Sequence, residues 1–217
     1  MRGEKSFWVA IGLIGLGLAG IFVTGVMSGC MLPMMGGMMD RGEMRKMMRE
    51  MMGGILPPGV SPRDLPDAGG EGARLLAAYC PQCHNLPSPR MQTAEDWPRV
   101  AGRMFARERT MAGMRGMMMG VSVPTPQEEE ILLRYLKTYA MKALPPGAVP
   151  APDSPGAVLF QQTCAQCHAL PDPKQRAPSE WPAVVERMRS NMEAMGKRVI
   201  TEEEKSKIAD YLTRHAG

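Results

Sequence analysis

Two cysteine pairs with identical spacing are the residues of this sequence best suited to chemistry. Each pair has two residues between its cysteines and a histidine directly after the second cysteine. Two thiols at this spacing can bond to the two vinyl groups of one haem, and the adjacent histidine then lies beneath the iron as a ligand. The sequence therefore predicts two covalently attached haem c groups. The expected binding residues are Cys80, Cys83 and His84 in the first motif and Cys164, Cys167 and His168 in the second.

The two motifs lie in the two copies of an internal repeat. Cys80 and Cys164 are 84 positions apart (164 − 80), and so are Trp97 and Trp181 (181 − 97). The stretches GARLLAAYCPQCHNLPSPR and GAVLFQQTCAQCHALPDPK match in this register. A duplicated domain explains this agreement better than coincidence.

Zinc binding and dithiol redox chemistry are the alternatives for four cysteines in two pairs. Each pair belongs to its own copy of the repeat, and neither chemistry requires a histidine after both pairs. A thioredoxin-like dithiol would also need a βαβ context, whereas no stretch of the sequence shows strand alternation. Haem attachment is therefore the favoured interpretation.

The repeat predicts an all-α fold of two small tandem domains. We expect domain 1 at residues 71–142 and domain 2 at 156–217, joined by a proline-rich linker at 143–155. Domains of about 70 residues are small for a self-sufficient core, so a haem wrapped at the centre of each would complete it.

Three helices are predicted in each copy. The first ends at the first cysteine of the motif. The second begins near Glu95 and near Ser179, with Ser179 as an N-cap. The third begins at Thr125 and at Thr201, because the acidic residues that follow suit the positive end of a helix.

The chain resembles the class I c-type cytochromes, specifically their two-domain periplasmic dihaem forms, over roughly 71–142 and 156–216. The resemblance rests on a G-x-x-x-L/F pattern before Cys-x-x-Cys-His and on a last helix with a Tyr-Leu pair. In that family the first and last helices cross where a small residue meets an aromatic one. The resemblance implies the pairs Gly72 with Tyr135 and Gly156 with Tyr211.

Methionine is the expected sixth ligand of each iron. The chain has three histidines, and the one outside the motifs, His215, cannot serve both haems. Ligation by histidine and methionine also raises the reduction potential. The class I family places its ligand methionine about six residues before the last helix, which favours Met119 and Met195 as metal ligands.

Three other methionines stay open as ligands. Met104 and Met188 each follow their histidine by 20 residues (104 − 84, 188 − 168). They lie seven residues after the tryptophans on an apolar stripe, where methionine is more often part of the core. Met111 matches Met195 when both are counted from the tryptophans.

Residues 1–30 are expected to attach the protein to a membrane. No charged residue lies between Phe7 and Ser28, which is long enough for a helix to cross a hydrocarbon core of ~30 Å. Positive charge before this run favours export of the rest of the chain. The sequence Met-Ser-Gly before Cys30 resembles a lipobox, so a lipoprotein signal is the alternative to an anchor. Both place the haem domains on the periplasmic side of the cytoplasmic membrane.

Residues 31–70 are predicted to be a methionine-rich juxtamembrane segment followed by a proline-rich linker. The chain has 23 methionines, and ten of them lie in 31–52. Thioether sulfur selects Cu(I), so copper binding is one interpretation. A flexible amphipathic helix on the membrane or on a partner, or sacrificial oxidation of methionine, are the alternatives.

These observations favour a membrane-tethered one-electron carrier of a periplasmic respiratory or photosynthetic chain. Its expected partners are redox proteins, with no small-molecule substrate and no enzymatic activity. Nucleic-acid binding is unsupported, since the net charge is only +4 and no basic stripe carries interleaved aromatics. The alternatives are a dedicated electron-transfer subunit of a larger membrane oxidoreductase and a copper-handling cytochrome. A dihaem peroxidase would need an open iron site with acid–base groups, and no histidine is spare beside either haem.

Overall fold

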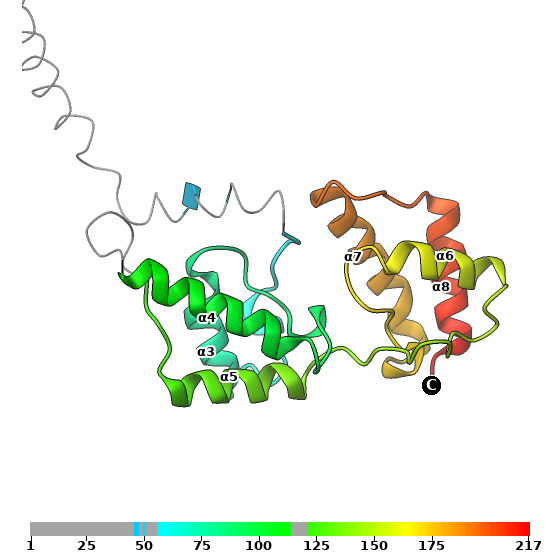
Figure 1. Ribbon diagram of the computed structural model, residues 1–217. Helices are drawn as coiled ribbons and strands as arrows, with labels where there is room; N and C mark the ends of the chain where they lie inside the picture. The colour runs from blue at the N-terminus through cyan, green and yellow to red at the C-terminus, as the bar shows by residue number, and fades with distance from the viewer. Residues whose placement is uncertain (1–45, 48–49, 51–55, 114–120) are drawn as a thin grey trace, which may run out of the picture. The chain divides into compact units, whose positions relative to one another are not determined.

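The computed structural model describes residues 46–47, 50, 56–113 and 121–217 (Figure 1). The elements of these ranges are α-helices and short 3-10 helices. Their only strand-like features are two isolated bridges, one between Thr93 and Met141 and one between Ala143 and Pro171. The predicted all-α class is confirmed for this part of the chain.

The first copy of the repeat folds into three α-helices, labelled in Figure 1. These are α3 (Glu71–Tyr79), α4 (Trp97–Gly113) and α5 (Pro126–Thr138). Three short 3-10 helices precede or connect them: η1 (Pro62–Asp64), η2 (Cys80–Gln82) and η3 (Pro89–Met91). The 3-10 turn η2 continues directly from α3, so the first cysteine lies at the end of the first helix, as predicted.

The second copy repeats this order of helices. It consists of α6 (Pro155–Cys164), α7 (Trp181–Ala194) and α8 (Glu202–His215). The 3-10 helices η4 (Pro173–Gln175) and η5 (Pro178–Glu180) lie between α6 and α7.

The starts of the last helices were predicted correctly, and those of the middle helices to within two residues. Thr125 caps α5 and Thr201 caps α8, each in a capping box with the glutamate three residues later. The middle helices start two residues later than expected, at the tryptophans. Ser179 is not the N-cap of α7, because it lies inside η5, whose Glu180 side chain accepts the backbone N–H of Ala177.

The first and last helices of each copy cross at a glycine. A Cβ atom added to Gly72 would lie 2.5 Å from Cβ of Tyr135, and one added to Gly156 would lie 2.6 Å from Cβ of Tyr211. Only glycine permits such an approach of two backbones. The two pairs implied by the class I resemblance are therefore present.

Each copy has its own cluster of buried side chains. In both clusters the tryptophan that opens the middle helix and the tyrosine of the last helix are buried. The larger members of the first cluster are Leu76, Trp97, Phe105, Leu132 and Tyr135, and those of the second are Phe160, Trp181, Ile200, Ile208 and Tyr211. Each copy of the repeat thus contributes one cluster of buried side chains.

Within the ranges described above, no helix is both long and apolar enough to cross a membrane. The predicted anchor or signal at 1–30, with Cys30, and most of the methionine-rich segment lie outside those ranges.

Candidate haem-binding sites

The first Cys-x-x-Cys-His motif forms the turn that ends α3. Cys80 continues the helical hydrogen bonding, since its N–H donates to the carbonyl of Leu76. Cys83 follows η2, and both thiols are free and half-buried. A helix end thus holds two unpaired thiols one turn apart, and the half-buried His84 follows directly.

The second motif also lies at the end of the first helix of its copy, with slightly more exposure and without a 3-10 helix at its cysteines. Cys164 is the last residue of α6, and both Cys164 and Cys167 are free thiols. Cys167 is exposed, whereas Cys164 and His168 are half-buried. Burial raises the pKa of the Cys164 thiol to about 12, with a smaller contribution from Cys167. Burial likewise raises the pKa of Cys80 to about 12, so both leading cysteines are protonated thiols at neutral pH.

Both histidines are held in the tautomer that a metal ligand requires. Nδ1 of His84 lies 2.8 Å from the carbonyl oxygen of Asn85, and Nδ1 of His168 lies 2.7 Å from that of Ala169. A carbonyl oxygen only accepts, so Nδ1 carries the proton in each ring. In the neutral ring, Nε2 then has its lone pair available to bind iron, and the carbonyl fixes the orientation of the ring.

Two polar atoms near the motifs are buried without a hydrogen-bond partner among the described residues. They are Oε2 of Glu108, on α4, and Oγ1 of Thr163, which directly precedes Cys164. Buried polar atoms in proteins are normally satisfied, so an orphan indicates a missing group or water. Free thiol pairs, an unprotonated Nε2 and unsatisfied polar atoms beside them fit haem c in each copy.

Glu108 distinguishes the first site from the second. Its side chain is 8% exposed, and burial raises its pKa to about 7, with the charge of Glu129 adding to the rise and Arg109 opposing it. Its charge also raises the pKa of both Cys80 and Cys83, after the larger effect of burial. The repeat offset places Met192 at the corresponding position (108 + 84), and Met192 is buried in the second core. One site therefore has a carboxyl group where the other has a thioether.

Among the candidate methionines of the first copy, the structure places one beside the cysteine motif. Sδ of Met111 lies 3.9 Å from Sγ of Cys83. Met104 has Nη1 of Arg107 4.0 Å from its Sδ, on a half-buried side of α4. Met119 lies outside the described ranges, so its role stays a prediction. Met111 is the candidate that the structure brings to the first motif.

The methionines of the second copy differ in how deeply they are buried. Met188 is half-buried against the second core, as its place on the apolar stripe predicted. Met195 is the half-buried C-cap of α7. Met192 is more deeply buried than either and was not identified from the sequence.

The sequence also gave no role to the glutamine inside each motif. The side chain of Gln82 bonds to the backbone of Ser122, and that of Gln166 bonds to the backbone of Arg198. The identical position of the two glutamines was the available signal, but their partners are set by the path of the chain.

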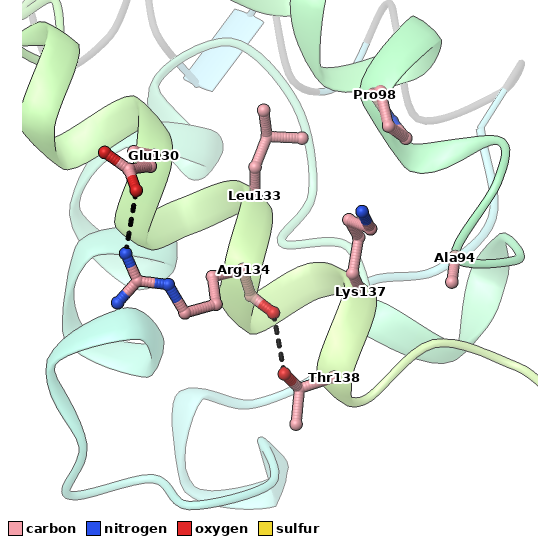
Figure 2. Close-up of a pocket in the computed structure, with 7 residues that line it drawn as sticks. All are labelled: Ala94, Pro98, Glu130, Leu133, Arg134, Lys137 and Thr138. Atoms are coloured by element: carbon pink, nitrogen blue, oxygen red, sulfur yellow. Dashed lines mark hydrogen bonds and ion pairs between the residues drawn. The ribbon is translucent and has the colours of Figure 1, made fainter.

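The described residues hold no group of three or more histidine, cysteine, aspartate or glutamate side chains that could bind a metal ion. Figure 2 shows a separate surface pocket of the first copy, between the start of α4 and α5, where Glu130 pairs with Arg134. Its lining contains neither the cysteines nor the histidine of the motif, so it is distinct from the haem site.

Comparison with known proteins identifies the second copy. Residues 151–212 match the family model described as cytochrome c oxidase, cbb3-type, subunit III. No curated protein and no solved structure matches the chain at a significant level. The matched range contains Cys164, Cys167, His168 and Met195. The segment from residue 151 to residue 212 is therefore a c-type cytochrome domain, the kind of domain that binds haem c covalently and transfers electrons.

Proposed function

We propose that this protein is a dihaem c-type cytochrome that carries one electron at a time, with one haem c in 71–142 and one in 156–217. The observation that carries the proposal is the recurrence of the complete site in both copies. Each has two free thiols at a helix end and a histidine whose Nε2 is left unprotonated by a carbonyl 2.7 or 2.8 Å from Nδ1. One of these copies matches a c-type cytochrome family, and the other shares its helix order and its glycine–tyrosine crossing.

The residues of each site have distinct roles in binding haem c. Haem c, when bound, supplies one-electron exchange between Fe(II) and Fe(III). Cys80 and Cys83 would anchor it covalently in the first copy, and Nε2 of His84 would bind the metal. The carbonyl of Asn85 keeps the His84 ring in one orientation, which limits reorganisation between oxidation states. The second copy uses its equivalent residues in the same roles.

Methionine is proposed as the sixth ligand of the iron in both copies. In the second copy we propose Met195, six residues before Thr201. In the first copy the contact between Met111 and Cys83 supports Met111, which is also the repeat equivalent of Met195. Met119 is the competing ligand by its distance from Thr125. A methionine at each iron leaves no open position for a substrate, which favours an electron carrier over an enzyme.

Attachment to the cytoplasmic membrane through residues 1–30, with the haem domains in the periplasm, is part of the proposal. It is supported by the long uncharged run of the sequence and by the positive charge before it. The expected partners are redox proteins on that side of the membrane. Copper binding by the methionines of 31–52 is kept as the less favoured alternative function of that segment.

The optical spectrum of the purified full-length protein tests the proposal. We expect two covalent haems per chain, a methionine–iron band near ~700 nm in the oxidised protein and no response of the reduced protein to carbon monoxide. The paired variants C80A/C83A and C164A/C167A should each retain one haem. A single haem in the wild type, or a haem that reacts with carbon monoxide, would contradict the dihaem electron carrier.

A second candidate function is that of a dedicated subunit of a membrane oxidoreductase. It is favoured by the description of the matching family, which is subunit III of a cbb3-type cytochrome c oxidase. Purification from native membranes in mild detergent separates the two functions. A stable complex with cytochrome c oxidase activity would support the subunit, whereas a protein that elutes alone and reduces an added oxidase would support the free carrier.

A further inference from the structure

The glutamine of the first motif connects two segments that are 40 residues apart. Nε2 of Gln82 donates to the carbonyl of Ser122 at 2.9 Å, and N–H of Ser122 donates to Oε1 of Gln82 at 2.8 Å. Nε2 also donates to the carbonyl of Tyr79 at 3.1 Å, within the turn of the motif itself. Gln82 is buried, at 9% exposure. A two-way amide pair thus fastens the haem-attachment turn to the segment that enters α5.

The second copy forms the corresponding contact with a weaker geometry. Nε2 of Gln166 donates to the carbonyl of Thr163 at 3.1 Å and lies 3.5 Å from the carbonyl of Arg198. Ser122 and Arg198 both lie three residues before the threonine that caps the last helix (125 − 122, 201 − 198). The same contact therefore recurs in two different sequences. At 3.5 Å the second one is longer than the usual range of a strong N–H···O bond.

The segment that Gln166 contacts follows directly after the candidate ligand Met195. Arg198 is three residues beyond Met195, and Nε of Arg189 donates to the carbonyl of Ile200 at 3.2 Å in the same segment. The N–H of Lys197 donates to the carbonyl of Met192 at 2.8 Å. The glutamine thus makes a hydrogen bond between this segment and the cysteine side of the site, while the other two bonds connect the segment to α7.

We propose that Gln82 and Gln166 are positioning residues that hold the segment before the last helix against the haem-attachment turn, and that the second copy is the more easily opened of the two. This inference rests on the proposed dihaem function. In each copy the iron would be bound by the histidine of the turn and by a methionine that precedes the segment bonded to the glutamine, Met195 by three residues (198 − 195) and Met111 by eleven (122 − 111). A hydrogen bond between the turn and this segment opposes their separation, and that separation would draw the methionine away and leave room for an external ligand.

The strength of the contact predicts the order in which the two sites open. In the first copy, separation breaks two bonds and leaves the N–H and carbonyl of Ser122 without their partner. In the second copy, separation breaks one long bond, and Gln166 keeps its bond to Thr163. An external ligand should therefore replace the methionine faster at the second iron than at the first.

The test is the rate at which imidazole binds to the oxidised full-length holoprotein, followed by loss of the ~700 nm methionine band. We expect two phases in the wild type. Gln82→Leu should accelerate the slow phase about tenfold, because it removes both bonds to Ser122. Gln166→Leu should accelerate the fast phase by a smaller factor. Gln82→Glu, which keeps an acceptor for the N–H of Ser122 and has the same size, should fall between the wild type and Gln82→Leu.

Haem content and thermal stability are measured on the same samples. Two covalent haems with unchanged imidazole kinetics in Gln82→Leu and Gln82→Glu would overturn the inference while leaving the proposed function intact. A lower melting temperature with unchanged kinetics would have the same meaning, since it would show a purely structural role. Fewer than two haems in the wild type would instead overturn the proposed function itself.

Discussion

Sδ of Met111 lies 3.9 Å from Sγ of Cys83, 28 residues earlier in the chain. The last turn of α4 thus lies against the haem-attachment turn, which begins at the end of α3. Met111 is also the repeat equivalent of Met195 (111 + 84). The thioether of Met111 is therefore placed to act as the sixth ligand of an iron bound at the first site.

The first prediction is that Met111 supplies the sixth ligand of the first copy. Met111→Leu should remove about half of the ~700 nm absorbance of the oxidised protein and make one haem reactive to carbon monoxide. Met104→Leu, on the same helix but with its sulfur beside Arg107, is the matched control and should leave the band unchanged. If Met119→Leu removes this half of the band and Met111→Leu does not, the prediction is wrong. Met119, six residues before Thr125, is then the ligand.

The second prediction concerns the pH dependence caused by Glu108. Burial raises the pKa of its carboxyl from 4.5 to about 7. The folded state therefore holds this proton more tightly than the unfolded chain does. The stability that Glu108 contributes is fully present below pH 4.5 and is lost as the pH rises through about 7. The loss amounts to about 3 kcal/mol at most.

Glu108→Gln and Glu108→Met test this prediction. Neither side chain ionises, and methionine is the residue that the second copy has at this position. Both variants should lack the fall in the free energy of unfolding between pH 4.5 and about pH 7, measured with denaturant on the holoprotein. The exposed Glu95→Gln is the control. A fall of the same size in Glu108→Gln and in the wild type would show that another group causes it.

Candidate attachment residues can be proposed from the sequence because covalent chemistry fixes their spacing. Cys80, Cys83 and His84 are neighbours along the chain, so a local pattern is enough to find them. The crossing of Gly72 and Tyr135 was also accessible, since a family resemblance carries that pair. The tautomer of His84 was not, because it depends on which way the carbonyl of Asn85 turns after the motif.

Contacts between residues far apart in the chain could not be predicted from the sequence. The repeat already aligned Glu108 with Met192, but burial of Glu108 depends on which face of α4 turns inward. Gln82 meets Ser122 across 40 residues, and no periodicity signals such a pair. The error at Ser179 has a local cause. A Ser-Glu-Trp-Pro sequence fits an N-cap, yet the preceding Pro178 begins a separate 3-10 turn that takes the serine.

The third prediction is that the helix crossings tolerate no side chain on their glycines. Gly72→Ala would bring a Cβ atom to 2.5 Å from Cβ of Tyr135, which forces α3 and α5 apart. We expect a loss of roughly 1–3 kcal/mol in the free energy of unfolding. Gly156→Ala should behave alike, because its Cβ would meet Tyr211 at 2.6 Å and the carbonyl of Lys207 at 3.0 Å.

Gly102→Ala is the matched control for these two variants. Gly102 lies within α4, is exposed, and an added Cβ would meet nothing within 4 Å. Because alanine has the higher helix propensity, this variant should gain roughly 0.5–1 kcal/mol. Chemical denaturation of the three variants gives the comparison. Equal stability of Gly72→Ala and Gly102→Ala would show that the crossing adapts without cost.

The last prediction is that each buried tryptophan holds the turn between the histidine and the middle helix. Nε1 of Trp97 donates to the carbonyl of Pro89 at 2.7 Å, and Nε1 of Trp181 donates to that of Pro173 at 3.0 Å. Both bonds are buried, and the acceptor prolines are the first residues of η3 and η4. Phenylalanine would keep most of the ring and leave the proline carbonyl unsatisfied, at a cost of about 1–3 kcal/mol.

Trp97→Phe and Trp181→Phe should therefore lower the denaturation midpoint of their own copies. They should also loosen the orientation of the histidine five residues before each proline (89 − 84, 173 − 168). Broadening of the proximal histidine signals in the paramagnetic NMR spectrum of the oxidised holoprotein would report that motion. Tyr139→Phe, which removes a hydroxyl from a half-buried ring of α5's C-cap, is the control for the loss of one polar group. Sharp, unshifted histidine signals in both tryptophan variants would mean that the turn is held by backbone contacts alone.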